Sequence, residues 1–112
     1  MKTGVLMVLI ILVMLLSGCL ARQGDKTTFD ELARIKCIEL CEAAKKTTDL
    51  SNGPCLSDNN LDWGVKDWVC DVAHWPREDV DNKPENQCQE FRSGKAHHFI
   101  EVDTNCNFIR AY

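Results

Sequence analysis

Residues 28–45, TFDELARIKCIELCEAAK, carry the clearest structural signal in this 112-residue chain. At 100° per residue the apolar side chains fall on one half of a helical wheel and most charged ones on the other half, which predicts an amphipathic helix. Thr28, followed three residues later by Glu31, matches a capping box at the helix N-terminus. Cys37 and Cys41 lie on the apolar half together with Phe29 and Leu32, so we expect the helix to bury this side and to present both thiols from it.

Three later stretches are rich in β-branched and aromatic residues, as strands are. They are residues 68–75 (WVCDVAHW), 96–102 (AHHFIEV) and 107–112 (NFIRAY), and residues 103–105 predict a turn between the last two. Residues 84–92, which begin with a proline, predict a short helix. We therefore predict an α+β domain in which an N-terminal amphipathic helix packs on a small antiparallel sheet of about three strands.

Composition restricts the classes of function. Apolar residues make up 45% of the chain and charged residues 27%, which suits one small folded domain. Asp and Glu (17) outnumber Lys and Arg (13), and a net charge of −4 argues against a nucleic-acid-binding protein. The sequence contains no G-x-S-x-G, H-E-x-x-H or glycine-rich phosphate-binding motif, which favours a binding or structural module over an enzyme.

The N-terminus has the pattern of an export signal. Lys2 precedes an apolar run from Val5 to Leu16, and twelve residues suit the core of a signal peptide but are short for a bilayer span of ~20 residues. The sequence LSGC at positions 16–19 resembles the lipobox of prokaryotic lipoproteins. This resemblance covers residues 1–20 and implies that residues 1–18 are removed and that the Cys19 thiol receives a diacylglyceryl group. An uncleaved anchor and an ordinary signal peptide are the alternatives, and each of them also exports the chain.

The cysteine count agrees with a lipid on Cys19. Of seven cysteines, acylation leaves an even number, and six in an exported domain predict up to three disulfides. No C-x-x-C pair occurs and only one pair is closely spaced, so we favour structural disulfides over metal binding or redox use. Helix geometry disfavours a bond between Cys37 and Cys41, which should reach different partners; the pairing is otherwise open. The six are Cys37, Cys41, Cys55, Cys70, Cys88 and Cys106.

Two histidines define the alternative functional class. In its predicted strand, each of His74 and His98 points to the same face as the apolar residues of that strand. If these strands are neighbours, the two imidazoles could converge beside Asp71 or Glu101 and form an enzymatic or metal-binding site. His97 points to the opposite face from His98, so this adjacent pair cannot share one ion. We prefer the simpler interpretation that these are structural or surface histidines.

Tryptophans offer a second kind of candidate binding site. We expect Trp68 to pack in the core, whereas Trp63 and Trp75 lie beside charged residues and a proline. Exposed tryptophans form flat, rigid platforms for sugars or partner proteins. Trp63 and Trp75 are therefore the binding residues to test first.

One acidic stretch is similar to the start of a calcium loop. Asp58, Asn60 and Asp62 have the spacing of the first three EF-hand ligands, but Trp63 stands where glycine is needed and Val69 where the closing Glu is needed. We favour a solvated polar loop. The sequence predicts no metal ion and no cofactor.

Our leading hypothesis is a lipoprotein anchored on the extracytoplasmic side of a prokaryotic membrane. The acylated Cys19 would anchor the chain in the bilayer, and residues 19–27 would form a flexible tether. Residues 28–112 would form a small binding or structural module. An envelope protein, a glycan or a small ligand are the candidate partners. The alternative is a small extracytoplasmic enzyme or metal-binding protein that uses the histidine pair.

Overall fold

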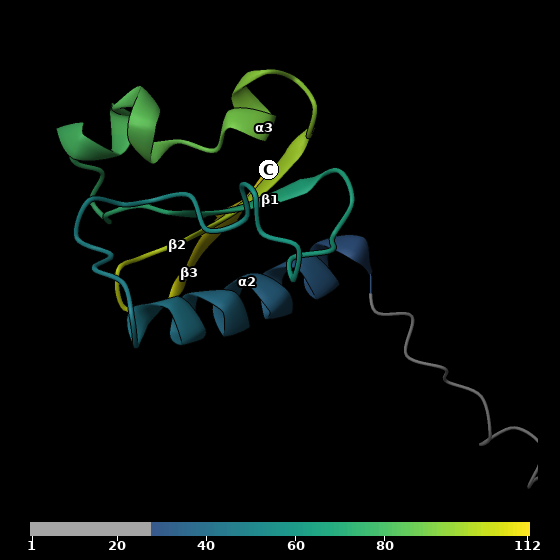
Figure 1. Cartoon of the computed structure of the whole chain (residues 1–112), viewed down its shortest axis with the longest axis horizontal. Helices are drawn as coiled ribbons and strands as arrows, with labels where there is room; N and C mark the ends of the chain where they lie inside the picture. Colours follow the sequence, from purple (N-terminus) through teal and green to yellow (C-terminus); the bar gives the residue numbers. More distant parts are fainter. Residues whose placement is uncertain (1–27) are drawn as a thin grey trace, which may run out of the picture.

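The computed structural model describes residues 28–112; the predicted signal peptide, Cys19 and the tether lie outside these residues. Helix α2 (Phe29–Lys45) precedes strand β1 (Trp68–Val72), and strands β2 (His98–Val102) and β3 (Phe108–Ala111) end the chain. Figure 1 shows the sheet between α2 on one side and the short elements that connect β1 to β2 on the other. These elements are the 3-10 helices η1 (Asp79–Asn82) and η2 (Pro84–Asn86) and the one-turn helix α3 (Gln89–Arg92). The predicted α+β class is confirmed.

The sheet is mixed, and the prediction of a wholly antiparallel sheet is wrong. The strand order is β1-β2-β3, with β1 parallel to β2 and β2 antiparallel to β3. A parallel pair needs a crossover connection of a dozen residues or more. Residues 73–97 supply one, because the two 3-10 helices and α3 carry the chain back across the sheet. The short helix predicted for residues 84–92 is thus two separate turns within this crossover.

Helix α2 buries only part of its apolar side. Ala33, Cys37 and Cys41 are completely buried, whereas Phe29 and Leu32, which we expected on the buried side, are 77% and 39% exposed. The helix is ~25 Å long but the strands reach only ~16 Å, so its first turns extend beyond the sheet. The predicted capping box is also absent: Thr28 is the N-cap residue, but its side chain makes no capping hydrogen bond.

Three disulfides join the elements, as predicted. Cys37–Cys70 ties α2 to β1, Cys41–Cys106 ties α2 to the turn before β3, and Cys55–Cys88 ties the long loop after α2 to the residue before α3. The two helix cysteines therefore have different partners, which confirms that part of the prediction. Both bridges of α2 belong to the main hydrophobic core, which fills the space between the helix and the sheet.

The other face of the sheet carries a smaller core. Val69 of β1, Cys88 and Ala96 are buried there, and Phe91 and Phe99 pack against them. Strand alternation explains the division, because Val69 precedes Cys70, which points to α2. The second face is only partly covered by the crossover, and it contains the candidate site.

No helix within residues 28–112 has the length and apolar character needed to cross a bilayer.

Candidate functional site

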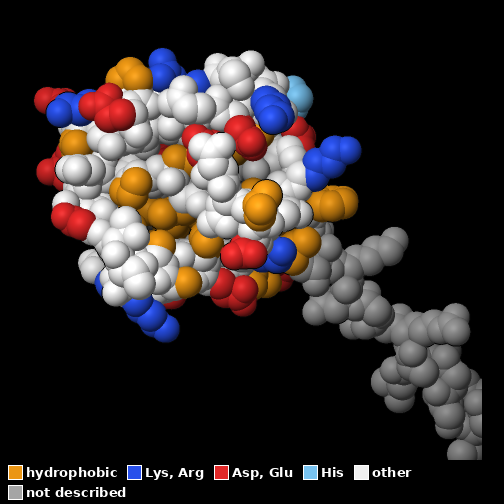
Figure 2. Space-filling view, in the orientation of Figure 1, with side chains coloured by type: hydrophobic (Ala, Val, Ile, Leu, Met, Phe, Trp, Pro, Cys, Tyr) orange, Lys and Arg blue, Asp and Glu red, His pale blue; other side chains and the backbone are white. Residues whose placement is uncertain are grey.

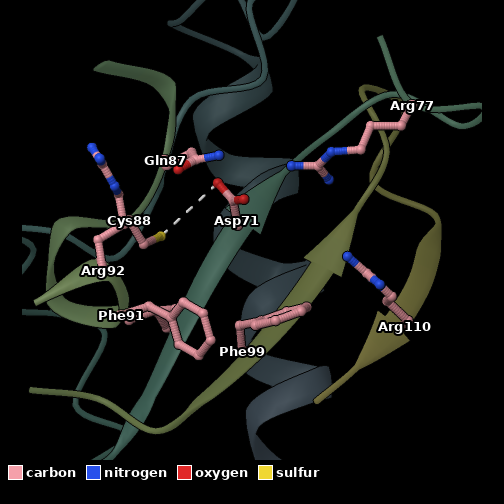
Figure 3. Close-up of a pocket in the computed structure, with 9 residues that line it drawn as sticks. Asp71, Arg77, Gln87, Cys88, Phe91, Arg92, Phe99 and Arg110 are labelled. Carbon is pink, nitrogen blue, oxygen red and sulfur yellow. Dashed lines mark hydrogen bonds between the residues drawn. The ribbon is translucent and has the colours of Figure 1, made fainter. Parts of the chain in front are cut away.

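A cleft of about 350 Å³ opens on the sheet face opposite α2. Its floor comes from β1 and β2, its sides from α3, the crossover and β3, as Figure 3 shows. We call it the arginine cleft because three of its nine lining residues are arginines. The lining residues are Val69, Asp71, Arg77, Gln87, Cys88, Phe91, Arg92, Phe99 and Arg110.

Aromatic rings form the apolar part of the cleft. Phe91 of α3 meets Phe99 of β2 edge to face, with ring centroids 5.1 Å apart, and Tyr112 stacks on Phe99 at 5.3 Å. The position of α3 is fixed by Asp58, whose carboxylate accepts hydrogen bonds from the backbone N–H groups of Gln89 (2.7 Å) and Glu90 (3.4 Å). Asp58 thus caps a helix N-terminus, as acidic side chains often do.

A β-bulge directs Arg110 into the cleft. Glu101 opposes Arg110 in the β2–β3 ladder, but the next residue, Val102, opposes Phe108, so that Ile109 is the extra residue. Because of this irregularity Phe108 packs with the main core on the helix side, while Arg110 lies on the cleft side, with its guanidinium 5.2 Å from the Phe99 ring centroid. Phe108 and Arg110 are two positions apart and would share one face of a regular strand, so it is the bulge that places them on opposite faces.

The arginines differ in how far they are paired. Glu101 is buried, and its carboxylate accepts hydrogen bonds from Arg77 Nη1 at 3.0 Å and lies 3.4 Å from Arg110 Nε. Arg92 is exposed and has no ion pair among residues 28–112. Arg92 is therefore the arginine of the cleft that is most available to a ligand.

The carboxyl group of Asp71 is mostly protonated at neutral pH. Burial raises the pKa of its carboxyl group to about 8, and the negative charges of Glu101 and Asp81 act in the same direction, while Arg77 opposes them. The charged lining of the arginine cleft is thus three arginines, two of which pair with Glu101. The cleft is cationic although the whole chain is acidic.

The Cys55–Cys88 disulfide lies against Asp71. Cys88 Sγ is 3.9 Å from Asp71 Oδ1, the contact that Figure 3 marks. One sulfur from each cysteine and one carboxylate oxygen lie within 4.8 Å of one another. This spacing would suit a metal ion, but bridged sulfurs are not thiolates and do not act as metal ligands. A disulfide sulfur also carries no hydrogen, so any hydrogen bond across this contact has the protonated Asp71 carboxyl group as its donor.

The structure does not bring His74 and His98 together. His98 pairs with Trp68 at the start of the parallel ladder, and Val72 ends it, so His74 lies beyond the opposite end of β1. The predicted strand 68–75 is three residues too long, because after Val72 the chain turns away to form the crossover. The hypothesis of a shared site beside Asp71 or Glu101 is therefore wrong in its geometry.

Each histidine has separate carboxylate partners. His74 Nδ1 is 2.9 Å from Asp81 Oδ1 and His74 Nε2 is 2.9 Å from Glu78 Oε2. At the other end of the sheet, His98 stacks on Trp68 with ring centroids 4.7 Å apart, and its Nε2 lies 3.6 Å from Asp67 Oδ2. Both arrangements are those of structural or surface histidines.

The two candidate tryptophans have opposite environments. Trp63 is 6% exposed, and its indole N–H donates a 2.8 Å hydrogen bond to the Trp68 carbonyl, so it is a core residue and our expectation of a binding role was wrong. Trp75 is 73% exposed, and it lies with His74 beside a shallow hollow. Neither side chain lines the arginine cleft.

The sequence did not reveal the arginines of the cleft. Arg77, Arg92 and Arg110 lie in three distant segments, and no spacing rule connects them. The only available signal was the predicted alternation of residues 68–75, which places Asp71 on the opposite face from Cys70 and thus on the face that α2 leaves free.

Comparisons with known proteins give no relative for this chain. No protein family model matches the sequence, and no curated protein and no solved structure is significantly similar to it. The function of the arginine cleft has therefore to be inferred from its own chemistry.

Proposed function

We propose that this chain is a lipid-anchored extracytoplasmic binding module whose arginine cleft binds a small organic anion, such as a carboxylate with an apolar body. The cleft carries this proposal, because it combines an unpaired arginine with two aromatic rings that meet edge to face, in a volume that suits a small molecule. Arginine binds carboxylates through two parallel N–H donors, and Phe91 and Phe99 offer apolar contact area next to it.

Asp71 and Gln87 would add neutral hydrogen-bond donors to this site. An ionised Asp71 would repel an anion, but its raised pKa keeps the carboxyl group protonated at neutral pH. Gln87 lines the same cleft, and its side-chain amide supplies further N–H groups. A protonated acid and an amide are directional donors, so they favour an anionic ligand over a cation.

The proposed extracytoplasmic location of the protein rests on its sequence and on its disulfides. The lipobox-like LSGC sequence supports lipid attachment at Cys19, and three disulfides are typical of an oxidising compartment outside the cytoplasm. A diacylglyceryl group with a further acyl chain gives stable attachment to a bilayer. Intact-mass measurement of protein extracted from membranes should then show the loss of residues 1–18 and the added mass of the lipid.

Benzoate and benzamide provide a matched pair of probes, because they have the same shape but differ in charge. We expect benzoate to shift NMR signals of Asp71, Phe91 and Phe99 saturably in the full chain solubilised in dodecylmaltoside. Benzamide should bind about tenfold more weakly, since the charged hydrogen bond to Arg92 is lost. R92Q should weaken benzoate binding by a similar factor.

The control for this experiment is R34Q. Arg34 lies on α2, where its guanidinium covers Phe108 on the helix side of the sheet, so the variant removes the same charge at a distance from the cleft. Benzoate affinity should not change in R34Q. Equal affinity for benzoate and benzamide, or shifts outside the cleft, would refute the proposed ligand class.

A further inference from the structure

The three disulfides differ in their surroundings. In the bridges of α2, three of the four cysteines are 0% exposed and Cys106 is 4% exposed. The third bridge lies on the other face of the sheet, where Cys88 borders the arginine cleft. Cys55 is the one cysteine of the six that is not buried. An external thiol can therefore reach the third bridge most readily.

We propose that Cys55–Cys88 is an exchangeable redox disulfide, in which an external thiolate attacks Cys55 and Asp71 protonates the departing Cys88 sulfur. The reductant is a low-molecular-weight thiol or the thiol of a partner protein. This inference goes beyond anion binding and does not depend on it. It also separates one bridge from the purely structural role that the sequence suggested for all three.

The exchange proceeds in two steps. The thiolate forms a bond to Cys55 Sγ, the bond from Cys55 Sγ to Cys88 Sγ breaks, and the electron pair of that bond stays on Cys88 Sγ. The Asp71 carboxyl proton moves to this sulfur, so that a Cys88 thiol and an Asp71 carboxylate remain. A second thiolate then attacks the external sulfur of the mixed disulfide, and Cys55 leaves as a thiolate while the reductant becomes a disulfide.

Asp71 is placed for this proton transfer. Its Oδ1 atom lies 3.9 Å from Cys88 Sγ, and the pKa of its carboxyl group, raised by burial, keeps a proton available at neutral pH. A leaving sulfur departs faster when it is protonated or otherwise stabilised. Arg77, which also lines the cleft, stabilises the carboxylate that forms.

Ser57 supports the other sulfur. Its buried hydroxyl oxygen is 3.6 Å from Cys55 Sγ and accepts a 2.8 Å hydrogen bond from the Cys70 backbone N–H. The hydroxyl hydrogen is free to turn toward the sulfur, where it can stabilise a Cys55 thiolate after reduction. Both sulfurs of this bridge therefore have a hydrogen-bond donor beside them.

The charged groups around Asp71 determine the pH range in which it acts. Asp71 on β1 faces Glu101 of β2, Arg110 of β3, Arg77 and Asp81 of the crossover, and Arg92 of α3. Glu101 and Asp81 raise the pKa of Asp71, and Arg77 lowers it. The acid is protonated below pH about 8 and loses its proton above this value.

Timed reduction of the full chain in dodecylmaltoside tests the proposal. Dithiothreitol is added, samples are quenched with iodoacetamide, and the labelled cysteines are mapped by mass spectrometry. We expect Cys55 and Cys88 to be labelled at least about tenfold faster than the other four cysteines. D71N should slow their labelling by about tenfold or more at pH 7, because an amide cannot supply an acidic proton. The matched control is D79N, since Asp79 is exposed on η1.

The pH dependence of the reduction rate distinguishes acid catalysis by Asp71 from a disulfide that is reduced faster only because it is more accessible. The rate, divided by the thiolate concentration, should fall above pH about 8 in the unmodified chain and stay level in D71N. Equal labelling rates for all three bridges would overturn the proposal. A D71N protein that reduces as fast as the unmodified chain, with the same pH profile, would overturn the role of Asp71. The profile of the unmodified chain decides the question even if D71N does not fold, and benzoate binding is measured separately.

Discussion

We expect the double replacement C41A and C106A to lower the free energy of unfolding by about 4 kcal/mol. This bridge joins cysteines 65 residues apart, the longest separation of the three. A crosslink over such a distance removes conformational entropy from the unfolded chain, worth about 4 kcal/mol. The loss is comparable to the whole stability of many small domains. Guanidinium denaturation of the full chain in detergent, followed by circular dichroism under oxidising conditions, measures it.

The other two bridges form a natural control. Cys37–Cys70 and Cys55–Cys88 have the same sequence separation of 33, so the entropic term is equal for both. The first is completely buried in the main core, and its removal also leaves a cavity. We therefore expect C37A with C70A to cost more than C55A with C88A. A loss below about 1 kcal/mol for C41A with C106A would contradict the entropic argument.

The replacement D81A should cost about 3 kcal/mol, because it removes the acceptor for several donors at once. The Asp81 side chain is 1% exposed and accepts hydrogen bonds from the backbone N–H groups of His74 (3.0 Å) and Glu78 (2.9 Å). It also contacts His74 Nδ1 at 2.9 Å. Backbone donors left unpaired in a buried place cost roughly 1–3 kcal/mol each. Thermal and guanidinium denaturation measure the effect, and D79A, at an exposed position of the same turn, should change little.

The contribution of Asp81 to the free energy of unfolding should depend on pH. Burial alone would raise the pKa of Asp81, but hydrogen bonds from Glu78 and His74 outweigh it and hold the pKa below its usual range. The stabilisation is therefore complete above the pKa of an unfolded Asp, near 4, and is lost as the pH falls through the lower pKa of the folded state. The difference in stability between the unmodified chain and D81A should shrink below pH about 4. A difference that stays constant down to pH 2 would show that the carboxylate charge is not what stabilises this turn.

Local patterns predicted the elements of this fold better than their arrangement. The helix of residues 28–45 and the C-terminal strands have strong periodic patterns, and their positions are nearly correct. The parallel pairing of β1 and β2 has no local signature, because it depends on how residues 73–97 cross the sheet. The same crossover separates His74 from β1, so the error in sheet direction and the error in the histidine site have one cause.

The candidate site depended on contacts that no sequence pattern contains. Arg110 reaches the cleft because of a bulge opposite Glu101, and Arg92 reaches it because Asp58 positions α3. The cysteine count predicted up to three bridges, but Cys55–Cys88 differs from the two core bridges through the partial exposure of Cys55 and through Asp71 and Ser57 beside its sulfurs. The folded neighbourhood, rather than the residue type, makes these groups chemically distinct.

All three disulfides cross the same stretch of the chain. Each one joins a cysteine before residue 56 to a cysteine after residue 69, and Leu61, between them, is fully exposed. A protease that cleaves the backbone at Leu61 would therefore produce a two-chain molecule whose halves stay covalently attached at three points. Such a nicked domain would migrate as one species in a non-reducing gel and as two fragments after complete reduction, so resistance to dissociation does not require resistance to cleavage.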